Sequence, residues 1–136
     1  MTGKLIACTL SMFTFFFIFV ISISLYIHIC VNERVNDICY DMAETVSVRG
    51  VVTDIMFDYL NENIDVYGDF TVEILAEVKT KDGGSIFLRG IDQIKNKELS
   101  VGDKVFITAA NEYPTLFEKL SGNDEGIFVS KVAVIN

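Results

Sequence analysis

Residues 5–31 read LIACTLSMFTFFFIFVISISLYIHICV, a stretch of 27 residues without a single Asp, Glu, Lys or Arg. Phe, Ile, Val and Leu dominate this stretch. At about 1.5 Å per residue, a helix of this length extends about 40 Å, which exceeds the roughly 30 Å of hydrocarbon in a bilayer. We therefore predict a transmembrane anchor over residues 1–31, and membrane lipid as its first partner.

The charged residues lie almost entirely beyond this stretch. All 19 acidic residues follow Val31, whereas one of the 11 basic residues, Lys4, precedes Leu5. The remaining part of about 100 residues is one small domain by length, and its net charge is about −9. Such a domain repels phosphate, so we expect no nucleic-acid partner. Lys4 and the α-amino group favour a cytoplasmic N-terminus, which predicts a single-pass protein of the cell membrane with an extracytoplasmic C-terminal domain.

The anchor is expected to continue as an amphipathic helix over residues 32–63. Apolar residues recur there at spacings of four, three, four and four, and polar residues fall between them, which is the period of one helix face. Such an apolar stripe needs cover from its own domain or from a neighbouring subunit. We predict that it is an interaction stripe for a partner subunit, formed by Val31, Val35, Ile38, Met42 and Val46.

Residues 44–54 allow two interpretations. β-Branched residues favour a strand, and Gly50 interrupts a helix; the β-branched residues concerned are Val46, Val48, Val51, Val52 and Thr53. The three- and four-residue spacings nevertheless persist on both sides of Gly50. We favour a helix that kinks or pauses at Arg49 and Gly50 and then resumes as far as Leu60; the alternative is a first β-strand.

Residues 64–136 are predicted to form a small β-rich extracytoplasmic domain. Apolar and polar residues alternate over 71–79, and the KDGG sequence at 81–84 then leads into a second apolar segment, as in a β-hairpin. Two further strands are expected over 104–109 and 127–135, with a short helix after Pro114 between them. The predicted fold class is α+β, a long N-terminal helix packed against a mainly antiparallel sheet of about four strands.

No residue pattern indicates an enzyme, a cofactor or a metal. His28 is the only histidine, and it lies near the end of the apolar stretch, where an interfacial position is expected. Its two-residue separation from Cys30 places the two side chains on different faces of a helix, unlike a pair of metal ligands. The NDEG sequence at 123–126 lacks the spaced ligands of a calcium loop and is expected to be a solvated turn. We therefore predict a non-enzymatic protein without catalytic, cofactor-binding or metal-binding residues.

The order of elements resembles type IV pilin-like proteins of the tight-adherence class, specifically the TadE-like minor pilins or pseudopilins. Residues 31–60, with Arg49 and Gly50 near their middle, occupy the position of the amphipathic segment of that family. Residues 102–108 (GDKVFIT) look like its Gly-Asp-x-Val strand, and residues 112–117 (EYPTLF) look like the proline turn that follows. The resemblance implies a hydrophobic helix that leaves the membrane and carries a small sheet on its outer half.

One feature departs from the prepilin pattern. Prepilins have a glycine at the cleavage site and a glutamate as the fifth residue after it, whereas Gly3 is followed at that distance by Cys8 and the span contains no carboxylate. A membrane-retained accessory subunit therefore fits better than a major pilin.

The leading functional hypothesis is a non-enzymatic, pilin-like structural or assembly subunit of a surface or secretion apparatus, whose partners are other pilin-like or assembly-machinery subunits. The alternative is a membrane-anchored oligonucleotide/oligosaccharide-binding (OB-type) β-barrel module, in which residues 46–53 are the first strand. A third option is a secreted adhesion domain released by cleavage after Ser24.

Overall fold

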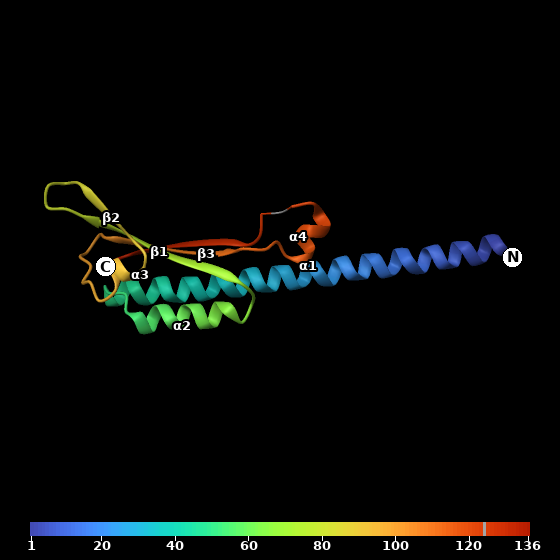
Figure 1. Cartoon of the computed structure of the whole chain (residues 1–136), viewed down its shortest axis with the longest axis horizontal. Helices are drawn as coiled ribbons and strands as arrows, with labels where there is room; N and C mark the ends of the chain where they lie inside the picture. Colours follow the sequence, from blue (N-terminus) through green and yellow to red (C-terminus); the bar gives the residue numbers. More distant parts are fainter. Residues whose placement is uncertain (124) are drawn as a thin grey trace.

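The computed structural model describes residues 1–123 and 125–136. It has the predicted α+β class, in which a long apolar N-terminal helix packs on a four-stranded antiparallel sheet (Figure 1). In chain order the elements are α1 (Thr2–Arg49), α2 (Asp54–Asp65), β1 (Phe70–Lys79), β2 (Ser85–Arg89), α3 (Ile91–Ile94), β3 (Lys104–Asn111), α4 (Leu116–Ser121) and β4 (Phe128–Val134).

Helix α1 is continuous over 48 residues and has two halves with different surroundings. Residues 1–19 are all exposed, and this half extends away from the rest of the molecule (Figure 1). The second half lies along the sheet and contributes Val35, Cys39, Met42 and Val46 to the core. One helix thus joins an uncovered apolar rod to a folded domain.

The pause predicted at Arg49 and Gly50 is present, but the chain then reverses direction. Gly50 adopts a left-handed conformation with φ of 67°, and its N–H donates to the Val46 carbonyl at 2.8 Å, which ends α1. Thr53 then accepts the N–H of Met56 and caps α2, which runs back beside α1 (Figure 1). A glycine with positive φ turns the chain without the strain that a side chain would add there.

The first strand required by the OB-type alternative is absent. Residues 46–49 are the last turn of α1, and among residues 46–53 only Val52 makes a β-type contact, an isolated parallel bridge to Lys95. The structure therefore overturns the barrel interpretation. Val46 is accommodated within α1 because it is fully buried, so packing outweighs its weak preference against helix.

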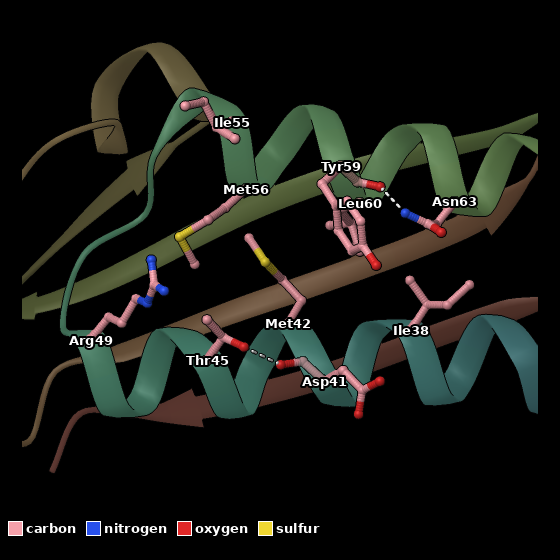
Figure 2. Close-up of a pocket in the computed structure, with 10 residues that line it drawn as sticks. All are labelled: Ile38, Asp41, Met42, Thr45, Arg49, Ile55, Met56, Tyr59, Leu60 and Asn63. Carbon is pink, nitrogen blue, oxygen red and sulfur yellow. Dashed lines mark hydrogen bonds between the residues drawn. The ribbon is translucent and has the colours of Figure 1, made fainter.

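The four strands are arranged in the order β2-β1-β3-β4. The predicted hairpin at 81–84 joins β1 to β2, and Ile74 of β1 faces Ile107 of β3 in the register. Helices α1 and α2 cover one face of this sheet, with α1 over β3 and β4 and α2 beside it (Figure 2). The connection from β3 to β4 contains α4, which lies against α1 near the end of the uncovered half (Figure 1).

Candidate interaction surface

The predicted interaction stripe forms part of the domain's own core. Val35 and Val46 are fully buried and Met42 nearly so, while Val31 and Ile38 are partly buried against the same cluster. These five residues are thus covered, wholly or in part, from within the domain, and their role as an interaction stripe for a partner stays a prediction. Strands β3 and β4 run alongside the second half of α1, so the sheet supplies the cover that had been assigned to a neighbouring subunit.

A groove of about 320 Å³ lies between α1 and α2, next to the stripe. The thioethers of Met42 and Met56 point into the gap from the two helices, and Tyr59 leans from α2 toward α1 (Figure 2). Its volume is at the lower end for small-molecule pockets. It is lined by Ile38, Asp41, Met42, Thr45, Arg49, Ile55, Met56, Tyr59, Leu60 and Asn63.

Two polar side chains of this groove, those of Thr45 and Asn63, hydrogen-bond within their own helices. Thr45 donates its hydroxyl to the Asp41 carbonyl at 2.8 Å, and Asn63 donates its amide to the Tyr59 carbonyl at 2.7 Å (Figure 2). The groove is chemically suited to an apolar side chain against flexible thioethers.

A second surface, which the sequence did not indicate, joins α4 to α1. His28 Nδ1 lies 2.9 Å from Thr115 Oγ1, and the His28 ring lies 5.4 Å from the Phe117 ring between centroids. Ser24, one turn earlier, is buried, and its hydroxyl donates to the Val20 carbonyl at 2.8 Å. The sequence carries a local signal for the start of α4, because Thr115 with Glu118 three residues later is a capping-box sequence, but none for its contact with α1.

The buried polar groups serve the fold. Asp103 accepts the N–H of Lys79 at 3.0 Å and that of Ser100 at 2.8 Å, one with each carboxylate oxygen. Glu118 accepts the N–H of Thr115 at 2.7 Å and completes the capping box of α4. Burial raises the pKa of the Cys39 thiol to about 11, which makes it a poor nucleophile at neutral pH.

Within residues 1–123 and 125–136, no three His, Cys, Asp or Glu side chains cluster so as to hold a metal ion. The turn expected at 123–126 includes Asp124, which lies outside the described residues. The chain offers three surfaces suited to packing and docking, namely an uncovered apolar helix, an interhelical groove and a partly exposed short helix. The comparisons add no relative, since no protein-family model, no curated protein and no solved structure matches the chain.

Proposed function

We propose that the protein is a non-enzymatic, membrane-anchored, pilin-like structural or assembly subunit of a surface or secretion apparatus. The observation that carries the proposal is the double role of α1. Its first half is long and apolar enough to cross a membrane once, and its second half is the central helix of the folded domain. A rigid link of this kind transmits the position of the anchor directly to the domain, as a scaffolding subunit requires.

The distribution of charge supports the proposed topology. The uncovered half of α1 has Lys4 at its start and no carboxylate, whereas every acidic residue belongs to the domain or to the turns of α1 nearest to it. In the proposed topology, Lys4 lies on the cytoplasmic side of the membrane and the acidic domain on the other side. This agrees with the tendency of basic residues to stay on the cytoplasmic side. The proposed location is the cell membrane, with a cytoplasmic N-terminus and an extracytoplasmic domain.

The order of elements supports the pilin-like part of the proposal. A helix that leaves the membrane and carries a small antiparallel sheet on its outer half is the arrangement implied by the resemblance to TadE-like proteins, and the present fold is compatible with it. The proposed partners are other membrane helices, which would pack against the uncovered half of α1. Because the stripe is buried within the domain, the uncovered half of α1 is the longest apolar surface that remains for contacts with partner subunits.

Site-specific photo-crosslinking in the membranes of the native host tests the proposal. A photoreactive amino acid is placed singly at each of residues 8–19, all of which are exposed. Packing against partner helices should give crosslinked adducts at positions that repeat with the helical period, for example Cys8, Met12, Phe15 and Phe19, and few adducts on the opposite face.

Carbonate extraction of the same membranes separates anchoring from assembly. A chain that resists extraction but gives no periodic adducts would retain the anchor and contradict the assembly role. A chain released by carbonate would contradict both. Exposed Phe87 on β2 provides a matched photo-crosslinking control outside the uncovered half.

A further inference from the structure

Helix α4 lies beside the part of α1 that belongs to the uncharged stretch. His28 of α1 contacts Thr115 and Phe117 there, and the uncharged stretch ends only at Val31. At about 1.5 Å per residue, His28 is about 5 Å inside the end of that stretch. Figure 1 shows α4 as the part of the domain that reaches furthest toward the uncovered half of α1.

This region exposes three large apolar side chains, together with the charged residues Glu112 and Lys119. Tyr113, Leu116 and Leu120, which we call the α4 tip, are exposed to 63%, 58% and 44%. These side chains precede or belong to α4, whereas Phe117 faces inward against His28. Large apolar side chains displayed together beside an apolar helix are unfavourable in water and favourable at a lipid boundary.

Several polar groups of α4 are hydrogen-bonded within the helix and its cap. The Thr115 hydroxyl accepts the N–H of Glu118 at 3.3 Å, and the buried Glu118 carboxylate accepts the N–H of Thr115. Lys119 is the exposed charged residue of α4, and a long lysine side chain can extend its ammonium group to the lipid headgroups. Two N–H groups at the start of α4, those of Thr115 and Glu118, are thus hydrogen-bonded within the protein. This lowers the free-energy cost of moving the start of the helix out of water.

We propose that the α4 tip inserts into the boundary between headgroups and acyl chains of the membrane that α1 crosses, as a second lipid contact of the domain. The occupant is the lipid surface, because the tip is continuous with the apolar stretch of α1 at the same height along that helix. Two contacts, one from α1 and one from the α4 tip, fix the height and the tilt of the domain above the bilayer. The inference rests on the proposed membrane anchoring.

The test uses tryptophan fluorescence, since the chain contains no tryptophan. Three single variants of the full chain are reconstituted in phosphatidylcholine vesicles that carry bromine, a quencher, either near the headgroup end or near the methyl end of the acyl chains. Leu116→Trp reports on the α4 tip, and Phe16→Trp reports on the uncovered half of α1. Phe87→Trp is the matched control, because Phe87 is 60% exposed and lies on β2, at the end of the molecule opposite the N-terminus (Figure 1).

The proposal expects Leu116→Trp to be quenched, and more strongly by bromine near the headgroup end. Phe16→Trp should be quenched more strongly by bromine near the methyl end, and Phe87→Trp should keep its fluorescence in both kinds of vesicle. Quenching of Phe16→Trp without quenching of Leu116→Trp would overturn the tip contact while anchoring stands, and would be the result if a protein partner covers the tip. Loss of quenching at both positions would overturn the anchor as well. Leu120→Trp repeats the measurement at a second exposed position, in case the first variant does not fold.

Discussion

The imidazole Nδ1 of His28 lies 2.9 Å from the hydroxyl oxygen of Thr115, although the two residues are 87 positions apart in the chain. This hydrogen bond ties the connection between β3 and β4 to the last turns of the uncharged stretch. Its donor depends on the tautomer of His28, and the Thr115 hydroxyl also accepts the N–H of Glu118. The position of α4 on α1 therefore depends on a contact that no local sequence pattern specifies.

Removing this contact should loosen α4 without unfolding the sheet. We expect His28→Ala and Thr115→Val each to lower the free energy of unfolding by about 0.5–1.5 kcal/mol for the hydrogen bond, and Thr115→Val by about 1 kcal/mol more for the lost helix cap. Chemical unfolding of the full chain in detergent micelles measures both effects. A double-mutant cycle should give a non-zero coupling energy, whereas additive effects would contradict a direct His28–Thr115 interaction. Thr115→Ser keeps both hydrogen bonds and is the control.

A charge at Val35 should unfold the domain. Val35 is fully buried between α1 and the sheet, so Val35→Asp places an unpaired carboxylate in the core at a cost of several kcal/mol. The matched control is Val48→Asp, because Val48 lies on the same helix and is 78% exposed; we expect a change within about 0.5 kcal/mol. Thermal unfolding followed by circular dichroism distinguishes the two variants. Equal midpoints for Val35→Asp and the unmodified chain would restore the interpretation of the stripe as an intersubunit surface.

The elements with a regular local period could be predicted from the sequence. Alternation over β1 and the KDGG turn indicated the first hairpin, and the spacing from Val31 to Val46 correctly identified the inward face of α1. What covers that face could not be predicted, since an apolar stripe has the same pattern whether a sheet or a second subunit packs on it. The reversal of chain direction at Gly50 could not be predicted either. The three- and four-residue spacings are the same for a kinked helix and for two antiparallel helices.

The candidate surfaces were the least predictable features. The α1–α2 groove exists only because α2 returns beside α1, which places Met56 opposite Met42. The contact of α4 with His28 joins residues at opposite ends of the chain. Such long-range relationships depend on the topology of the sheet and not on the local sequence.

Asp103 should be required for the turn that precedes β3. Its carboxylate is buried and accepts the N–H groups of Lys79 and Ser100, so it connects β1 to the start of β3. Asp103→Ala leaves two backbone donors without these acceptors, and we expect a loss of about 2–4 kcal/mol in the free energy of unfolding. Asp103→Asn keeps one acceptor oxygen and should lose less. A smaller loss for Ala than for Asn, measured by chemical unfolding, would contradict the acceptor role.

The stability of the domain should fall in alkaline solution because of Cys39. Burial raises the pKa of this thiol to about 11 from an ordinary value of 9.0, and the positive charge of Lys131 opposes the rise. Because the pKa is higher in the folded state, the unfolded chain releases the proton first as the pH rises. The neutral thiol therefore contributes its full stabilisation below about pH 9, and this contribution is lost as the pH rises through 11.

The expected loss attributable to Cys39 is up to about 3 kcal/mol, since each unit of pKa difference corresponds to about 1.4 kcal/mol. Other groups also titrate in this range, so the measurement is the difference between the unmodified chain and Cys39→Ala. Unfolding free energies are determined for both at intervals from pH 7 to 11. The difference should be constant up to about pH 9 and should then move in favour of Cys39→Ala. Parallel curves over the whole range would show that the Cys39 thiol ionises as readily in the folded chain as in the unfolded one.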